Sequence, residues 1–217
     1  MNNRNGALIL IINYYSGLSI VLGVVLAILL NPTGAQLILF TLCWIYLLPA
    51  LICRALILVL GRPVGTVDDS SPVFLYWWFL TQLQMIYARL PFLEEILRFF
   101  PGLYSLWLKI WGAKVSLFVY WSPGITIADR YHINIGSRAI IGGGCRIGAH
   151  LIALDKERKQ RLTLAPVTID SGAMVGLHAA VGPGCHVYAG EIVPAGKLLK
   201  PFYSIKDGRI HRPATDA

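Results

Sequence analysis

The C-terminal half of the chain repeats every six residues, and this rhythm constrains the fold more than any other feature. An aliphatic residue recurs at positions 135, 141 and 147, and again at 169, 175, 181, 187 and 193. A small residue follows four positions later, at Ala139, Cys145, Ala173, Ala179 and Cys185. A period of six matches neither the 3.6-residue period of a helix nor the two-residue period of a lone strand. The repeat therefore predicts short β segments that turn a corner every six residues, three to a coil, as in a parallel β-helix.

The rhythm breaks once, between Ile147 and Ile169, which lie 22 residues apart instead of a multiple of six. The inserted segment contains the run DKERKQR at residues 155–161. A run this charged is unsuited to the wall of a coil, so we expect residues 154–165 to project as a loop. The sequence predicts a β-helix of about four coils over residues 115–200, irregular in its first coil, and a polar tail over residues 201–217.

The N-terminal part of the chain is apolar enough for a membrane. No charged residue lies between Arg4 and Arg54, and the whole chain has a mean hydropathy of +0.62 with 56% hydrophobic residues. Residues 7–30 and 36–60 each exceed the roughly 20 residues that a helix needs to cross a bilayer. The Asn-Pro-Thr-Gly sequence at 31–34 predicts a tight turn between them. We expect residues 1–62 to form a transmembrane helical hairpin, because the first run is too long for a signal peptide and lacks its cleavage motif.

The charges that flank the hairpin predict its orientation. Arg4 precedes the first run and Arg62 follows the second, whereas the turn between them carries no charge. The excess of basic residues on the cytoplasmic side places both termini and the β-helix in the cytoplasm, at the inner (cytoplasmic) membrane. Arg54 lies inside the second run. Either the helix ends near Cys53 and the chain bends along the surface, or Arg54 reaches the lipid headgroups, or it faces a buried substrate phosphate.

Residues 63–114 connect the two parts. A polar linker at 64–71 precedes two aromatic-rich segments, 72–88 and 91–114, and the second is broken by Pro101 and Gly102. Dense Trp and Tyr with scattered basic residues is typical of amphipathic helices that lie in the membrane interface. The alternative is that these helices cap the β-helix against solvent, and the two are compatible. The net charge of +8 suits an anionic membrane surface, and without an aromatic-basic motif we expect no nucleic-acid partner.

The cysteines and histidines do not form a metal-binding pattern. None of the four cysteines is spaced as in Cys-x-x-Cys, and Cys145 and Cys185 occupy the small position of the repeat, which should face the interior of the coil. His178 and His186 stand eight residues apart, which is not the spacing of a metal site of this fold. We therefore expect buried free thiols and no metal.

Several stretches resemble the hexapeptide-repeat acyltransferases, a family with a left-handed β-helix. They are IGAH at 147–150, VGLHAAVGPG at 175–184, PVTI after the charged segment, and AGK followed by KPFYSI at the end of the repeat. The GAKV sequence at 112–115 is similar to colanic-acid-type acetyltransferases, and the apolar region resembles the membrane part of poly-lysine-synthetase-type enzymes. The resemblance covers residues 111–210. It implies a homotrimer that moves an acyl group, usually acetyl from acetyl-CoA or another acyl thioester, to a hydroxyl or an amine, with a His as general base.

Two histidines are the main candidates for this base. His150 directly precedes the charged segment, and His178 stands at a corner of the next coil. An imidazole titrates near neutral pH and can deprotonate an acceptor. Maltose- and galactoside-type acetyltransferases have their His in the stretch that matches residues 155–158, where this chain has none, which favours a different branch. Asp155 or Glu157 is a candidate to orient the base, although pairing with the neighbouring basic residues is the alternative. The remaining histidines are His132, His186 and His211.

The resemblance also suggests where the thioester binds. Lys197 and Lys200 match the lysine-bearing last coil and are expected to hold the CoA phosphates, with Gly176 and Ala195 at corners beside the cofactor. The basic side chains of the charged segment are an alternative holder for phosphates of CoA, of a carrier-protein arm or of a lipid-linked substrate.

These observations predict an integral-membrane acyltransferase, most simply an O-acetyltransferase. An amphiphilic or lipid-linked acceptor is expected, because a membrane anchor raises the local concentration of such a substrate and not of a soluble one. Two alternatives stay open. One is transfer from an acyl carrier protein thioester to an amine in natural-product assembly, and the other is a non-catalytic trimeric membrane scaffold.

Overall fold

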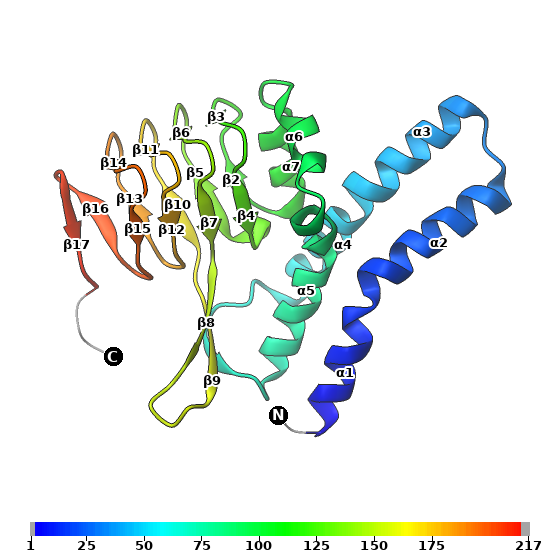
Figure 1. The fold of residues 1–217 in the computed structure, drawn as a ribbon, viewed down its shortest axis with the longest axis horizontal. Coiled ribbons are helices and arrows are strands. Elements are labelled where there is room, and N and C mark those ends of the chain that lie inside the picture. Colours follow the sequence, from blue (N-terminus) through cyan, green and yellow to red (C-terminus); the bar gives the residue numbers. More distant parts are fainter. Residues whose placement is uncertain (1–2, 214–217) are drawn as a thin grey trace.

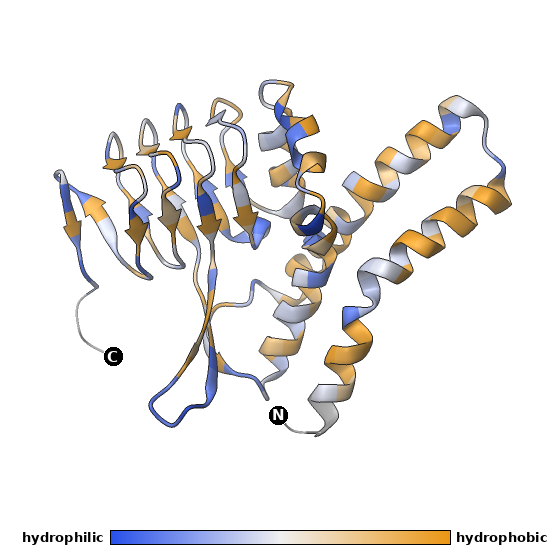
Figure 2. Cartoon of the chain, viewed as in Figure 1, coloured by the Kyte–Doolittle hydropathy of each residue, from blue (hydrophilic) through white to orange (hydrophobic). Residues whose placement is uncertain are grey.

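The computed structural model describes residues 3–213, in which a helical N-terminal part packs against one end of a β-helix (Figure 1). The helical hairpin comprises α1 (Asn3–Asn13), α2 (Tyr15–Leu30), α3 (Gly34–Leu42), a π-helical turn (Cys43–Leu47) and α4 (Leu48–Leu60). The segments Gly6–Leu30 and Gly34–Leu60 are long and apolar enough to cross a membrane, and only 6% and 22% of an apolar 18-residue stretch in each is buried. Low burial distinguishes them from the core helices of a soluble protein, and Figure 2 shows their apolar residues along the length of the hairpin.

The irregular turn in the second arm of the hairpin is caused by Pro49. Proline has no N–H, so the carbonyl of Ile45 loses its helical donor. The Tyr87 hydroxyl donates to this carbonyl instead, and Trp107 Nε1 donates to the next carbonyl, that of Tyr46, at 2.9 Å. The Tyr46 hydroxyl in turn donates to the carbonyl of Leu93 at 2.9 Å. These bonds fasten the middle of the hairpin to the helices that follow it.

Three helices lie between the hairpin and the β-helix: α5 (Pro72–Arg89), α6 (Phe92–Arg98) and α7 (Leu103–Trp111). The Ser71 hydroxyl caps α5 by accepting from the N–H of Val73 at 3.2 Å. Along α5 and α7, one face is buried in the same core as the first coil. These helices therefore cap the β-helix, as one of the two sequence-based interpretations predicted. α6 and the turn after it also leave large apolar side chains exposed, namely Phe92, Ile96, Phe99 and Phe100.

The six-residue repeat forms the predicted parallel β-helix. Its strands make three sheets: a first with β2, β5, β10, β13, β16 and β17, a second with β3, β6, β11 and β14, and a third with β4, β7, β12 and β15. The repeat aligns in register, so that Ile141, Val175 and Val193 are stacked neighbours in the second sheet, and all three are fully buried. Cys145 and Cys185 face the interior as predicted, as free and buried thiols. The strands are β2 (Lys114–Val115), β3 (Tyr120–Trp121), β4 (Thr126–Ala128), β5 (Ile133–Ile135), β6 (Ile140–Ile141), β7 (Arg146–Gly148), β10 (Val167–Ile169), β11 (Met174–Val175), β12 (Ala180–Val181), β13 (His186–Val187), β14 (Ile192–Val193) and β15 (Leu198–Leu199).

The repeat extends beyond residue 200. β16 (Ser204–Lys206) adds a further parallel strand to the first sheet, and β17 (Arg209–His211) folds back on it antiparallel. Part of the segment expected to be a polar tail is therefore the last layer of the coil. The buried Ile205, which pairs with Val187, accounts for this difference.

The insertion is an ordered β arm and not a loop. β8 (His150–Leu154) and β9 (Gln160–Leu164) form an antiparallel hairpin, and β1 (Gly65–Asp68), from the segment expected to be a polar linker, pairs with β9. The arm starts at His150, four residues earlier than the expected loop, and its turn carries the charged residues (Figures 1 and 2). Leu162 and Leu164 bury their side chains against Phe74 and Trp77 of α5, which holds the base of the arm in place.

Candidate active site

A buried carboxylate is paired with a histidine at the base of the arm. His150 Nδ1 lies 2.5 Å from Asp129 Oδ2. The two residues meet because β4 and β7 are neighbours in the third sheet, with Ala128 opposite Gly148. After these strands, both segments turn the same corner toward the first sheet. The side chain of Asp129 is 1% exposed and that of His150 is 28% exposed. The pair therefore has a buried side and a side that a ligand can reach.

The carboxylate is held by a second donor. Trp77 Nε1 of α5 donates to Asp129 Oδ1 at 3.0 Å, so each carboxylate oxygen has one partner. Asp129 has a left-handed backbone with φ of 56°, a conformation that Asp tolerates better than most residues. The Trp77 ring also meets the imidazole of His150 edge-on, with 4.9 Å between the ring centroids. One tryptophan thus orients both members of the pair.

This geometry defines the tautomer of His150. An ionised Asp129 only accepts, so Nδ1 carries the proton and donates to it, and Nε2 is left as the basic nitrogen. Burial lowers the pKa of His150, but the hydrogen bond to Asp129 and its charge raise it more, so the net pKa is above its usual value. The result is an imidazole with a free Nε2 of increased basicity, as general-base catalysis requires.

Asp155 does not reach this histidine. It lies at the turn of the arm, where its Oδ1 accepts from the N–H groups of Glu157 and Lys159 and its Oδ2 accepts from Arg161 Nε. β8 separates it from His150 along an extended strand. The carboxylate that orients His150 is Asp129, which sequence reasoning missed.

His178 stands at a different corner. It is exposed at the passage from the second to the third sheet, with φ of 55°, and its ring covers Gly144 of the preceding coil, where a side chain would collide with it. Within residues 3–213 it has no carboxylate partner. The structure does not bring His178 and His150 together.

The other histidines are engaged elsewhere. His186 Nε2 lies 2.7 Å from Asp170 Oδ2 on the outer face of the first sheet. His132 is buried, with Nε2 2.7 Å from the carbonyl of Pro63, and burial lowers its pKa. His211 Nε2 lies 3.1 Å from the carbonyl of Lys206.

The residues expected to hold CoA do not lie beside His150: Gly176 is one coil further on, and Ala195, Lys197 and Lys200 are two. Gly176 packs directly on the next coil, since a Cβ there would lie 2.5 Å from the Ala195 nitrogen. Lys197 and Lys200 line a surface hollow of about 300 Å³ together with Arg212. Lys200 follows the corner that carries His150, two coils on, whereas Gly176, Ala195 and Lys197 belong to the corner of His178. One chain therefore places Gly176, Ala195 and Lys197 on a different edge from His150, and Lys200 on the same edge two coils away.

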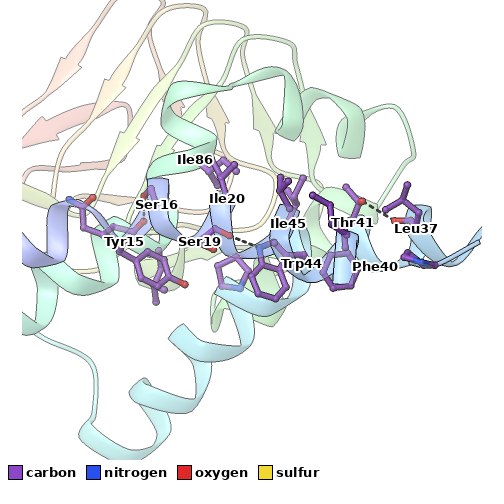
Figure 3. A pocket seen from close by; sticks show the side chains of 18 of the residues that line it. Tyr15, Ser16, Ser19, Ile20, Leu37, Phe40, Thr41, Trp44, Ile45 and Ile86 are labelled. Atoms are coloured by element: carbon purple, nitrogen blue, oxygen red, sulfur yellow. Dashed lines mark hydrogen bonds between the residues drawn. The ribbon is translucent and has the colours of Figure 1, made fainter. Parts of the chain in front are cut away.

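A second hollow lies within the hairpin, between α2, α3 and α5 (Figure 3). Its volume is about 440 Å³ and its walls are mainly apolar. Trp44 closes one side by donating from Nε1 to the carbonyl of Ser19 at 3.1 Å, over Gly23, where a Cβ would collide with the indole. Gln82 of α5 lines this hollow, whereas Trp77 on the other face of α5 contacts His150. Helix α5 thus separates the hollow from the His150–Asp129 pair.

No group of His, Cys, Asp and Glu side chains within residues 3–213 is arranged to hold a metal ion.

Comparison with known proteins gives limited similarity. No protein-family model matches the chain, and no curated protein matches it significantly. A crystal structure of a hexapeptide-repeat containing acetyltransferase from Vibrio cholerae is similar at 14% identity and a TM-score of 0.37, over 61% of this chain and 93% of that one. A structure of the acetyltransferase from Vibrio cholerae O1 biovar eltor complexed with acetyl coenzyme A is 19% identical with a TM-score of 0.31. That match covers 45% of this chain and 60% of the neighbour's length. These scores are too low to assign an activity or a site residue to this chain.

Proposed function

We propose that this chain is a membrane-anchored acyltransferase that moves an acyl group from a thioester, acetyl-CoA in the simplest case, to a hydroxyl of an amphiphilic or lipid-linked acceptor. The observation that carries the proposal is the His150–Asp129 pair, in which the buried carboxylate leaves His150 Nε2 free at an accessible corner of a hexapeptide coil. A thioester is already activated, so the protein has to deprotonate a neutral nucleophile, and this pair provides the base.

The proposed reaction uses His150 twice. Nε2 takes the proton of the acceptor hydroxyl while the hydroxyl oxygen attacks the thioester carbonyl. Asp129 stabilises the imidazolium that forms. The tetrahedral intermediate then collapses, the carbon–sulfur bond breaks, and the leaving thiolate takes the proton back from Nε2. The products are an ester and a free thiol, and His150 is regenerated.

The membrane placement is part of the proposal. The exposed apolar surface of the hairpin and the exposed aromatic side chains Phe92, Phe99 and Phe100 support a protein that spans the inner membrane and also contacts its interface, with both termini and the β-helix in the cytoplasm. The apolar hollow within the hairpin, with a volume of about 440 Å³, suits an alkyl chain of a lipid. An acceptor that shares the bilayer needs no long diffusion to reach His150.

The donor site is proposed at the basic end of the coil. Lys197, Lys200 and Arg212 gather three positive charges that suit the phosphates of CoA. In one chain they lie on a different edge from His150 or two coils away, so a homotrimer that completes the site between neighbouring chains fits this arrangement.

The test uses the full-length protein in lipid nanodiscs, with acetyl-CoA as donor and release of the CoA thiol as readout. We expect dodecyl maltoside, which joins sugar hydroxyls to an alkyl chain, to accept faster than maltose. His150→Ala should slow turnover by about 10²-fold or more, the usual contribution of a general base. His186→Ala is the matched control, since His186 pairs with Asp170 on the outer face of the first sheet, and it should stay within about twofold of wild type.

The same assay separates the alternatives. If the protein turns over only an acyl carrier protein thioester with an amine, the donor is the carrier protein and not CoA, and the acceptor is an amine and not a hydroxyl. Unchanged thiol release in His150→Ala would contradict the proposed base. No turnover of either donor by the wild-type protein would favour a scaffold.

A further inference from the structure

Two arginines converge on one glycine where the hairpin meets the capping helices. Arg62 Nη2 donates to the carbonyl of Gly112 at 2.5 Å. Arg54 Nη1 occupies the space where Gly112 has no side chain, because it would lie 3.1 Å from a Cβ there. Gly112 ends α7 with φ of 108°, a conformation that excludes most other residues. The fold thus holds two guanidinium groups together at the C-terminus of α7.

Their positive charge is not balanced by the protein. Among residues 3–213, no ion pair involves Arg54 or Arg62, whereas the buried Arg98 and Arg130 both pair with Glu94. The carbonyl end of α7 supplies the equivalent of about half a negative charge, which is small against two guanidinium groups. Each guanidinium has five N–H donors. One hydrogen bond, to Gly112, is formed by the pair in the described part of the chain.

The two arginines also act on each other. Burial lowers the pKa of Arg62, and the charge of Arg54 lowers it further. Both side chains are half-buried, so solvent screens this repulsion only in part. An anion between them would remove the repulsion and satisfy the free donors.

Further polar groups without partners surround the same place. The indole N–H of Trp111 and Nδ1 of His132 are buried and make no hydrogen bond in the described chain. Trp111 directly precedes Gly112, and Nε2 of His132 lies 2.7 Å from the carbonyl of Pro63, which follows Arg62. Buried polar atoms without partners are rare in native proteins, so two in one region indicate that a polar ligand or water belongs there.

The position of the arginines along α4 indicates which anion they would meet. Arg54 lies six residues before the end of α4 at Leu60, about 9 Å along the helix axis, and Arg62 follows that end. The last turn of α4 exposes Leu58, Val59 and Leu60 by 71%, 80% and 63%. On the proposed membrane placement this is the cytoplasmic end of a membrane-spanning helix, at the depth of the lipid headgroups. The anion available there is the phosphate of a lipid.

We propose that Arg54 and Arg62 form a binding site for the phosphate group of a membrane lipid. The planar forks of two arginines match the oxygens of a phosphate, which they bind by paired, charge-assisted hydrogen bonds. The site rests on the proposed membrane placement and not on acyl transfer, since neither arginine is bonded to His150 or Asp129 in the described chain.

The test measures binding of dioctanoyl phosphatidic acid to the full-length protein in detergent micelles by isothermal titration calorimetry. Dioctanoylglycerol, which has the same chains without the phosphate, and inorganic phosphate, which has no chains, are the two comparison ligands. We expect the phosphatidic acid to bind wild-type protein at least about tenfold more tightly than either. Arg54→Gln and Arg62→Gln should each weaken it by about tenfold or more, and leave dioctanoylglycerol unaffected.

Arg89→Gln is the matched control, because Arg89 is an exposed arginine in the last turn of α5 and should stay within about twofold of wild type. Arg62→Lys keeps a charge at the site and replaces a Gln variant that fails to fold. Its affinity should lie between those of wild type and Arg54→Gln.

Equal binding of phosphatidic acid by wild type, Arg54→Gln and Arg62→Lys would overturn the proposal. Inorganic phosphate that binds as tightly as the phosphatidic acid would overturn the lipid as its source. His150→Ala should bind the lipid as wild type does, so failure of acyl transfer and failure of this site can be told apart.

Discussion

The coil carries two His–Asp pairs, and their difference indicates what makes such a pair suitable for catalysis. In the first, His150 Nδ1 meets Asp129, whose side chain is 1% exposed and also bonded by Trp77. In the second, His186 Nε2 meets Asp170 at 2.7 Å on an outer sheet face where both side chains are 35% exposed. The second ring stacks on Tyr188, with 3.9 Å between centroids. Burial and a second donor to the carboxylate, and not the pairing itself, distinguish the first pair.

The largest effect is expected when the carboxylate of the first pair is removed and compared with removal of the carboxylate of the second. Asp129→Asn deprives the His150 imidazolium of its counter-charge and no longer fixes the tautomer, so we expect thiol release from acetyl-CoA to fall about 10²-fold or more. Asp170→Asn should stay within about twofold of wild type. Equal losses in the two variants, measured as kcat/KM in nanodiscs, would remove the distinction between the pairs.

The pH dependence sharpens the comparison. The rate requires unprotonated His150, whose pKa is raised, so kcat/KM should climb with pH and level off only above the usual histidine value of about 6.5. Asp129→Asn removes the bond and the charge that raise this pKa, so the rising limb should move to lower pH. Asp170→Asn should leave the limb where it is. A limb that stays in place in Asp129→Asn would show that His150 is not the titrating base.

The smallest effect concerns the donor to the buried carboxylate. Trp77→Phe keeps an aromatic ring against His150 but leaves Asp129 Oδ1 without its hydrogen bond, which makes the first pair more like the second. Loss of such a bond costs about 1–3 kcal/mol, so we expect a loss of up to about tenfold in kcat/KM and a lower Tm. Trp78→Phe is the control, because the Trp78 indole donates to Asn13 at 2.9 Å on an exposed face of the same helix. If Trp77→Phe lowers Tm more than Trp78→Phe does but the two variants have equal kcat/KM, then Trp77 has only a structural role.

The repeat was readable from the sequence because each coil there contributes the same buried positions, such as Ile141 and Val175. Asp129 was not readable, because the first coil departs from the six-residue rhythm. The sequence predicts an irregular first coil without its register, whereas the structure pairs Ile127 with Ile147 and so brings Asp129 beside His150. Only the strand register reveals that neighbour.

The arm was missed for a different reason. Its charged turn dominated the composition of the insertion and hid the alternating apolar residues Leu162 and Leu164 in β9. The partner strand β1 comes from a distant segment, residues 65–68, which by itself reads as polar and irregular. Pairing between segments nearly a hundred residues apart is decided by tertiary packing, which local patterns do not record.

The hydrogen bonds around Pro49 have a consequence for substrate choice. Tyr87, Trp107 and Tyr46 fasten the middle of the hairpin to the helices that carry the coil, and such bonds are costly to break where water is scarce. On the proposed placement, this rigid joint sets the height of His150 above the bilayer. An acceptor would then be selected by the distance between its hydroxyl and its lipid anchor, in addition to the chemical identity of the group that carries the hydroxyl.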